Sequence, residues 1–356
     1  MRPATATIDL GALAHNLAQV RARAPRSRIV AVVKANGYGH GAARLLAALA
    51  TAEMLGVACA EEALALRDAG ALQPILLMEG VFDAAELAAC AAERLEVAVH
   101  HAEQVRMLEC ARPTRPLVVW LKIDTGMHRL GVRPAEARAL HDRLSACRSV
   151  AGIRLMTHFA SADLPDPAPT EAQLARFAAL DLPGERSLAN SACVLAWPEA
   201  HADWVRPGIM LYGVSPLHGA SGAAHGLRPV MTLATRLIAL RDIPAGEPVG
   251  YAGAWTAARP TRVGTAAIGY GDGYPRHAPS GTPVLVNGRE APLIGRVSMD
   301  MITIDLTDHP AAAVGDPVVL WGDGLPAERI AEAAGTIAYE LLCGVTARVH
   351  VELRGG

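Results

Sequence analysis

Lysine is almost absent from this sequence of 356 residues. Among its 33 Lys and Arg residues, only Lys34 and Lys122 are lysines. Arginine can replace lysine as a surface cation, but its guanidinium cannot form a Schiff base with an aldehyde or take up CO2, whereas a lysine amine with an adjustable pKa can do both. The two lysines are therefore candidates for amine chemistry. The alternative is a GC-rich coding bias that left two lysines by accident.

Features of membrane, nucleic-acid-binding and disulfide-linked proteins are also missing. No apolar run approaches the roughly 18–20 residues of a membrane span, and Pro3, Asp9 and His15 interrupt the N-terminal stretch before a signal-peptide core could form. The net charge of −2 gives no electrostatic case for nucleic acid or a membrane surface. The six cysteines are scattered without a CxxC pair, which is typical of a reducing compartment and of a chain without a cysteine-based metal site. We therefore expect a cytoplasmic protein.

Residues 28–212 repeat one pattern, in which a short apolar run precedes a polar or glycine-bearing turn and then an Ala- and Leu-rich helical stretch. Eight runs fit this pattern, at 28–33, 54–59, 74–79, 95–100, 117–124, 150–158, 186–191 and 203–208. The last two are too short to rest on periodicity alone. Eight βα units predict an α/β fold with a parallel (β/α)8 TIM-like barrel, preceded by a helix at 11–24.

The pattern changes after about residue 225. Strand-like runs between turn signals follow, at 229–240, 262–270, 282–288, 301–306 and 316–322, with one helix at 327–335. Asn287-Gly288 predicts a hairpin turn. We therefore expect a barrel domain at 10–225 and a mainly β, antiparallel C-terminal domain at 226–356, to which residues 1–9 would add a strand.

Polar residues with chemical potential lie where the predicted strands end, which is where barrels of this kind carry their active sites. Lys34 follows the first strand, Lys122 lies near the end of the fifth, and His158 ends the sixth. Buried among apolar neighbours, Lys34 would have a lowered pKa and could attack an aldehyde as a neutral amine. Ser191 and Gly208 follow the last two strands.

The loops after the last two strands form a phosphate site in many barrels. Here they offer the Ser191 hydroxyl, Gly208 and backbone N–H groups, and the chain has no P-loop motif for a nucleotide. A lysine and a phosphate site in one barrel indicate pyridoxal 5′-phosphate (PLP), with its aldehyde on the lysine and its phosphate on these loops.

Nine sequence blocks resemble the alanine racemase family, in the family's order and over essentially the whole chain. They are VVKANGYGHG (32–41), LKIDTGMHRLG (121–131), THFASAD (157–163), NSA (190–192), VRPGIMLYG (205–213), VGYAGAW (249–255), IGYGDGYPR (268–276), VSMDM (297–301) and YELLC (339–343). The family fold, a PLP-binding barrel followed by a β domain, agrees with the predicted architecture.

The resemblance implies an isomerase that interconverts L-alanine and D-alanine with PLP, in a homodimer with shared active sites. Lys34 would bind the PLP aldehyde and act as the base on one face of the substrate. Tyr251, from the partner subunit, would act as the base on the other face, and one base on each face suits racemisation. Arg206 would face the pyridine nitrogen, with His158 in the same hydrogen-bond network.

The resemblance implies further contacts for the remaining positions. Arg129 would contact the PLP phenolic oxygen and the substrate carboxylate, and Lys122 would be carbamylated and would position Arg129. The other implied residues are Tyr38, Asn190, Ser191, Gly208, Ile209 and Tyr339 for the cofactor, and Met299, Asp300 and Tyr270 for the substrate. The C-terminal ARVHVEL departs from the family's usual ending, which leaves its packing open.

Other functions remain open at the level of sequence. A PLP-dependent decarboxylase of basic amino acids shares the architecture, but it needs a catalytic cysteine with an acidic neighbour, and this chain has VSMDM at 297–301. A non-catalytic PLP carrier resembles the barrel alone. A broad-specificity racemase differs in pocket size, which sequence does not show. Without its motif, Tyr251 would be a strand aromatic with a solvent-facing hydroxyl.

Overall fold

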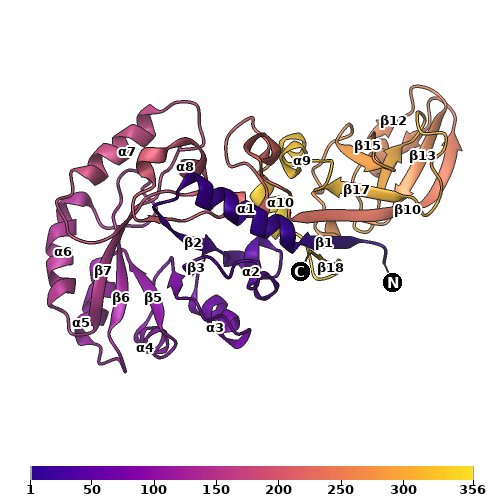
Figure 1. Cartoon of the computed structure of the whole chain (residues 1–356). Helices are drawn as coiled ribbons and strands as arrows, with labels where there is room; N and C mark the ends of the chain where they lie inside the picture. The colour runs from indigo at the N-terminus through magenta and orange to yellow at the C-terminus, as the bar shows by residue number, and fades with distance from the viewer. Residues whose placement is uncertain (1, 356) are drawn as a thin grey trace.

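Eight parallel strands close into a barrel in the computed structural model, which describes residues 2–355 (Figure 1). The strands are β2 (Arg28–Val32), β3 (Met54–Val57), β4 (Ile75–Leu77), β5 (Leu95–Val99), β6 (Leu117–Lys122), β7 (Val150–Met156), β8 (Arg186–Ser187) and β9 (Trp204–Val205). Each lies in one of the eight predicted runs, so the predicted barrel is confirmed, including its two short strands. The four strands from β3 to β6 are buried almost throughout, as expected for a parallel sheet covered by helices.

Helices surround the barrel strands, and aspartate side chains just before two of these helices explain where they begin. Asp9 accepts a hydrogen bond from Ala12 N at 2.8 Å and Asp83 accepts one from Glu86 N at 2.9 Å, so both act as N-caps. The helices are α1 (Leu10–Arg23), α2 (Lys34–Tyr38), α3 (Ala60–Asp68), α4 (Ala84–Ala92), α5 (Ala102–Cys110), α6 (Pro134–Ala146), α7 (Ala168–Ala178) and α8 (Ser191–Ala196). Short 3₁₀ turns are η1 (Ala42–Leu45), η2 (Pro198–Ala200), η3 (Ile209–Tyr212) and η4 (Gly222–His225).

Side chains fill the inside of the barrel. One buried cluster gathers a residue from nearly every strand, namely Val30, Met54, Leu76, Ala98, Trp120, Met156 and Trp204. The Arg154 guanidinium lies 5.2 Å from the ring centre of Trp120 and 4.9 Å from that of Trp204. Because the interior is packed in this way, a ligand of the barrel has room at its mouth, where the strands end.

The C-terminal half forms one eight-stranded sheet, in which six strands close on themselves. The strand order is β13-β16-β15-β14-β17-β10-β1-β18, and β13 also pairs with β10. The strands are β10 (Met231–Ile243), β13 (Thr261–Ala266), β14 (Pro283–Val286), β15 (Arg289–Ile294), β16 (Ile302–Asp305) and β17 (Pro317–Trp321), with a separate ribbon of β11 (Pro248–Val249) and β12 (Trp255–Thr256). The predicted hairpin turn is confirmed, since Asn287 and Gly288 have φ of 50° and 75° between β14 and β15.

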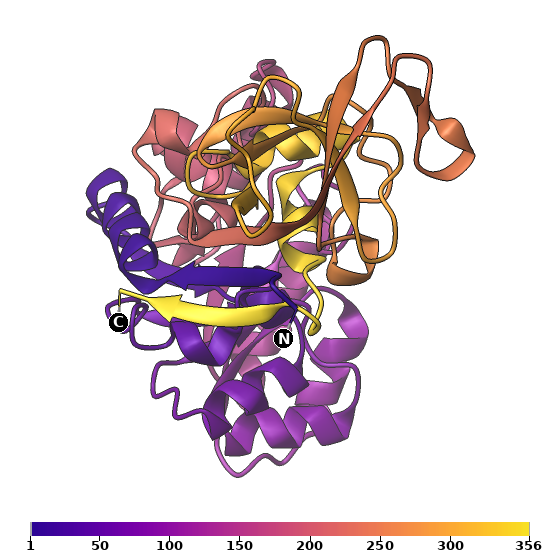
Figure 2. The ribbon, with the colours of Figure 1, turned by 90° about the vertical axis from the view of Figure 1, so that its right-hand side faces the viewer.

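Both ends of the chain join this sheet. The strand β1 (Thr5–Asp9) pairs antiparallel with β10 and parallel with β18 (His350–Arg354), and Figure 2 shows β1 and β18 side by side. The ARVHVEL segment is therefore the edge of the sheet. Because α1 starts directly after β1, the chain passes from this sheet into the barrel without a linker.

The helices α9 (Ala327–Ala334) and α10 (Ala338–Cys343) complete the C-terminal half, with the turns η5 (Tyr251–Gly253) and η6 (Tyr270–Asp272). The sequence predicted α9 but not α10, which has six residues. No helix within residues 2–355 combines the length and the apolar character that crossing a membrane requires.

Candidate active site

Lys34 begins a left-handed turn directly after β2. Ala35, Asn36, Gly37 and Tyr38 have φ of 51°, 52°, 66° and 52°. Left-handed backbone costs an L residue about 1–2 kcal/mol, so three such residues around Gly37 need support from their surroundings. Strained backbone of this kind concentrates at functional sites.

Side-chain acceptors hold this turn in place. Ala35 N donates to Glu62 Oε1 at 2.7 Å, and the other carboxylate oxygen of Glu62 accepts from Ala58 N at 2.9 Å. Ala42 N donates to Asn36 Oδ1 at 3.0 Å. Glu62 therefore fastens the backbone next to Lys34 to the end of β3.

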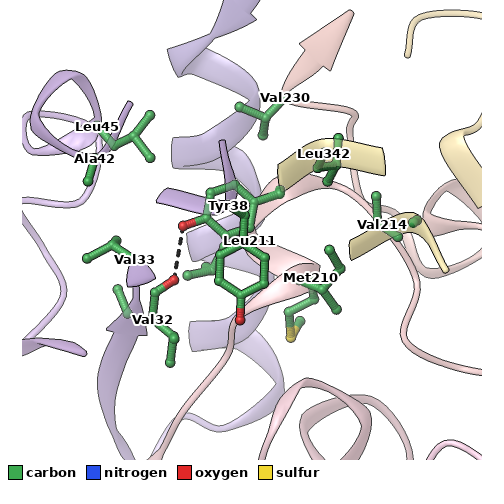
Figure 3. Close-up of a cluster of buried hydrophobic side chains, with 14 of the residues drawn as sticks. Val32, Val33, Tyr38, Ala42, Leu45, Met210, Leu211, Val214, Val230 and Leu342 are labelled. Carbon is green, nitrogen blue, oxygen red and sulfur yellow. Dashed lines mark hydrogen bonds between the residues drawn. The ribbon is translucent and has the colours of Figure 1, made fainter. Parts of the chain in front are cut away.

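Three aromatic rings pack together next to the turn. The stacked rings of Tyr38 and Tyr212 are 4.7 Å apart, and the His40 ring is tilted against Tyr212 at 4.6 Å. Tyr212 Oη donates to Val32 O at 3.0 Å, the hydrogen bond drawn in Figure 3. Burial raises the pKa of Tyr38 and Tyr212 and lowers that of His40 to about 4, so near pH 7 all three rings are neutral.

Five basic side chains from the ends of four strands, β2, β6, β7 and β9, lie near one another at the barrel mouth. Burial and the charges of Arg206, Arg129 and Lys34 lower the pKa of Lys122 to about 8. Burial and then Arg206 lower the pKa of His158 well below its usual value, which leaves this imidazole neutral at pH 7. The prediction that Lys34 is buried is wrong. Its side chain is half-buried at the open mouth, and Lys122, with 7% of its surface exposed, is the buried lysine.

Arg206 is fully enclosed and uses most of its donors on strand-end carbonyls. Its Nη1 donates to Ser187 O at 2.8 Å and to Ser187 Oγ at 2.5 Å, and its Nη2 donates to Thr157 O at 2.5 Å and to Leu188 O at 3.3 Å. Its Nε has no hydrogen-bond partner among the residues that the structure describes. Buried donors are normally paired. The free Nε–H therefore points to an acceptor supplied by a ligand.

The loops after β8 and β9 form a cradle of small groups. Ser191 Oγ accepts from Gly208 N at 2.8 Å and from Met210 N at 3.4 Å, which leaves its own hydroxyl proton to donate elsewhere. A Cβ atom at position 208 would lie 2.4 Å from Tyr38 Oη, so a larger residue there would have to displace the Tyr38 hydroxyl. Asn190 caps α8, since its side-chain oxygen accepts from Cys193 N at 3.1 Å.

The C-terminal helix α10 brings Tyr339 to the same cradle. The Tyr339 and Tyr38 rings are 6.0 Å apart. Burial, with a smaller effect from Asp163, raises the pKa of Tyr339 to about 12, so both phenols are neutral donors. Ile209 begins η3 next to Gly208. This set of neutral donors and nearby cations is suited to an anionic group such as phosphate.

Two residues in this arrangement were missed by the sequence reasoning. Glu62 holds the Lys34 turn, and Gln173 of α7 bonds to both the β6 and the β7 loops. Gln173 lies on the buried face of α7 with Thr170 and Phe177. A glutamine on the apolar face of a predicted helix is the signal that could have revealed it. Glu62 has no such signal, because an acidic residue in the first turn of a helix is common.

Comparison with known proteins assigns both halves of the chain. Residues 8–216 match the family description "Alanine racemase, N-terminal domain", and residues 230–353 match "Alanine racemase, C-terminal domain". The chain belongs to the alanine racemase family.

Individual members of the alanine racemase family match over full length. The biosynthetic alanine racemase of Salmonella typhimurium is 55% identical over 356 residues, which covers 99% of each chain. The alanine racemase of Yersinia pestis is 54% identical over 358 residues and the whole of each chain. The crystal structure of biosynthetic alanine racemase from Pseudomonas aeruginosa has a TM-score of 0.97, with 52% identity and 99% of each chain covered.

Besides Tyr339, four sequence-predicted residues of this racemase lie in the C-terminal half. Tyr251 stands in η5 between β11 and β12, and it is 70% exposed. Figure 1 shows β12 on the side of this half that lies away from the barrel. Tyr270 N donates to Ser298 O at 3.0 Å, so Tyr270 lies next to the Met299–Asp300 segment. Tyr251 thus lies in the C-terminal half, whereas Lys34 lies at the mouth of the barrel, and the fold of one chain does not place the two side chains together.

Charged residues from both chain ends hold that segment. The Asp300 carboxylate accepts from Arg348 Nη2 and lies 3.6 Å from Arg2 Nη1. Arg2 Nη2 also donates to the fully buried Asp272 at 2.6 Å. The hydrogen bond from Arg348 lowers the pKa of Asp300, so Asp300 is ionised at pH 7. Met299 is 52% exposed.

Proposed function

We propose that this racemase interconverts L-alanine and D-alanine with PLP bound at the mouth of the barrel. The free Nε–H of buried Arg206 carries the proposal, because it lies among basic groups and beside a cradle with neutral donors. A pyridine nitrogen is the acceptor that it fits. Family membership supports the substrate, since the matching relatives are named as alanine racemases.

The chain offers one partner for each polar group of PLP. Lys34 would hold the aldehyde, Arg206 the ring nitrogen and Arg129 the phenolic oxygen. The phosphate would lie against the cradle, whose members are Tyr38, Ser191, Gly208, Ile209 and Tyr339, with Asn190 fixing the start of α8. When bound, PLP supplies an electron sink for the charge left on the substrate α-carbon.

Arg206 would act as a donor and not as an acid. Burial lowers its pKa to about 10, which still leaves the guanidinium charged near pH 7. A charged guanidinium donates hydrogen bonds and disfavours a proton on the ring nitrogen that it faces. We infer that this limits the electron sink and so disfavours transamination as a side reaction.

Proton transfer would use one group on each face of the substrate. The Lys34 amine would remove or return the α-proton on one face, and the Tyr251 phenol would do so on the other. The 70% exposure of Tyr251 and the position of the neighbouring strand β12 away from the barrel (Figure 1) support a role in the site of a partner subunit, in a homodimer with shared sites. Exposed Met299, with Asp300 and Tyr270, would contact the substrate from the same side.

Lys122 would carry a carbamate that positions Arg129, because its amine is buried beside that cation. We place the domain boundary near residue 225, between β9 and β10. The cytoplasmic location stays a prediction from composition.

The test is racemisation of L-alanine by the purified protein with PLP, followed by chiral analysis. We expect D-alanine from the wild type, none from Lys34→Arg, and loss of the visible absorption of lysine-bound PLP in that variant. Lys34→Arg keeps the charge and removes the reactive amine, so equal activity would contradict the assignment of Lys34. A panel of L-amino acids in the same assay separates an alanine racemase from a broad-specificity racemase. CO2 release would indicate a decarboxylase.

A further inference from the structure

Gln173 is a buried amide that joins two loops of the barrel mouth. It lies on α7 with 2% of its surface exposed. Its Oε1 accepts from Ala160 N at 2.9 Å, and its Nε2 donates to His158 O at 3.0 Å and to Thr125 Oγ1 at 3.1 Å. Three hydrogen bonds from one side chain thus connect α7 with the loop after β6 and the loop after β7.

The backbone partners fix how this amide is oriented. A backbone N–H only donates and a backbone carbonyl only accepts, so Ala160 and His158 place the oxygen and the nitrogen of Gln173 unambiguously. A flipped amide would oppose donor to donor at Ala160 and acceptor to acceptor at His158. A single side-chain geometry therefore satisfies the two loops together.

The hydrogen bonds continue from Gln173 toward the centre of the site. Thr125 Oγ1 lies 2.8 Å from Thr157 Oγ1, and Thr157 O accepts from Arg206 Nη2 at 2.5 Å. The Thr125 carbonyl is also held by Arg176 Nη1 of α7 at 2.7 Å. Gln173 is thus linked through two threonines to the guanidinium that would face the PLP ring.

We propose that Gln173 is a positioning residue that sets the loop bearing Arg129 and the backbone of His158 relative to Arg206. It touches neither cofactor nor substrate in this role and acts through the two loops. The inference rests on the proposed function, in which Arg129, His158 and Arg206 hold PLP. Loss of the Gln173 amide would therefore make the loops after β6 and β7 more mobile even in the protein without PLP.

Gln104 provides a matched comparison within the same barrel. It is also 2% exposed, and it lies on α5. Its Oε1 accepts from His100 N at 2.8 Å and its Nε2 donates to Val81 O at 3.1 Å, so it joins the loops after β4 and β5. Those loops carry none of the proposed site residues. Removing either amide breaks the same kind of bridge, but only one bridge serves the site.

The experiment compares Gln173→Met with Gln104→Met, because methionine keeps the size of the side chain and removes its hydrogen bonds. The first readout is amide hydrogen exchange in the protein without PLP. Gln173→Met should raise the exchange rate of Ala160 and of the amides at 126–128 about tenfold or more, because their local opening becomes easier. Gln104→Met should raise the exchange rate of the His100 amide and leave the rates of the amides at 126–128 and at Ala160 unchanged.

The second readout is the affinity for PLP, followed by its visible absorption. Gln173→Met should weaken PLP binding about tenfold. Gln104→Met should keep the PLP affinity within about twofold of the wild type, because Gln104 joins loops outside the site and its hydrogen bonds contribute only to the stability of the fold. Thr170→Val is a further control on α7, because the Thr170 hydroxyl has no partner within residues 2–355. Equal PLP affinities and equal exchange at 126–128 in the two methionine variants would overturn the proposal.

Thr125→Val tests the same link without touching Gln173. It removes the hydroxyl that joins Gln173 to Thr157, so it should raise exchange at 126–128, and its effect on PLP affinity should not add to that of Gln173→Met. If Gln173→Met does not fold, Thr125→Val replaces it as the deciding variant, and unchanged exchange at 126–128 in it would overturn the proposal. If the wild type binds no PLP while the exchange differences appear, the proposed function fails and the positioning of the loops stands.

Discussion

Among single residues, Lys122 is the one whose chemistry depends most on its neighbours. Burial and the charges of Arg206, Arg129 and Lys34 lower its pKa to about 8. The neutral amine is the form that reacts with CO2 or bicarbonate, and its share rises as the pH passes upward through the pKa. We therefore expect carbamate occupancy to increase between about pH 7 and 9 and then to level off.

Carbon-13 NMR with labelled bicarbonate would follow this modification. A carbamate resonance should appear in the wild type, grow through pH 8 and be absent in Lys122→Arg, which has no reactive amine. A free Lys122 amine at pH 9 in excess bicarbonate would contradict the prediction. The result bears on Arg129, because a carbamate would replace a repelling cation with an anion beside that guanidinium.

Among the structural elements, the Lys34 turn and α10 bring the two halves of the chain into contact near the site. Gly39 has φ of 80°, and a Cβ atom there would lie 2.1 Å from Leu342 O. Gly70 has φ of 90°, but a Cβ atom there would meet nothing within 4 Å in the described chain. A substitution at Gly70 would therefore introduce backbone strain alone, whereas a substitution at Gly39 would add a clash with the backbone of α10.

Alanine at the two positions should have unequal effects. Gly70→Ala should lower the free energy of unfolding by about 1 kcal/mol, the cost of left-handed backbone in a residue with a side chain. Gly39→Ala should lower it by about 1–3 kcal/mol more, because α10 must move away from the turn. Urea unfolding of both variants without PLP measures the difference. Equal unfolding free energies would show that α10 does not constrain the turn.

Local sequence signals predicted most of the fold. The eight apolar runs became the eight barrel strands, because buried parallel strands have apolar residues on both faces. The strand β15 was missed, since Pro292 interrupts its pattern, and α10 is too short to show helical periodicity. The strand-end rule also placed Lys34, Lys122 and His158 at one end of the barrel.

Features that depend on distant residues were beyond these signals. The left-handed turn includes Ala35 and Asn36, and the acceptor that holds it, Glu62, is 27 residues away in the sequence. The same holds for Gln173, whose partner Thr125 is 48 residues away. Lys122 is buried as the last residue of β6, whereas Lys34 lies beyond the end of β2 in the turn, and the predicted runs, which extend past the observed strands, did not separate the two cases.

At the scale of the whole molecule, the proposed mechanism requires Tyr251 to reach Lys34. The barrel lies at one end of the chain and the β11–β12 ribbon at the other (Figure 1), while Tyr251 is 70% exposed. A symmetric dimer solves this geometry, because each subunit can present the same surface to its partner and complete two sites at once. Each site would then combine Lys34 of one chain with Tyr251 of the other.

Mixing two inactive variants tests this arrangement directly. Lys34→Ala and Tyr251→Phe should each be nearly inactive alone. After equal mixing and subunit exchange, half of the dimers are mixed, and each mixed dimer has one intact site, so about a quarter of wild-type racemisation should return. Lys34→Ala mixed with Lys34→Arg is the control, since no combination restores an amine at position 34. If labelled subunits demonstrably exchange and activity does not return, Tyr251 serves no partner, and the exposed η5 turn needs another explanation.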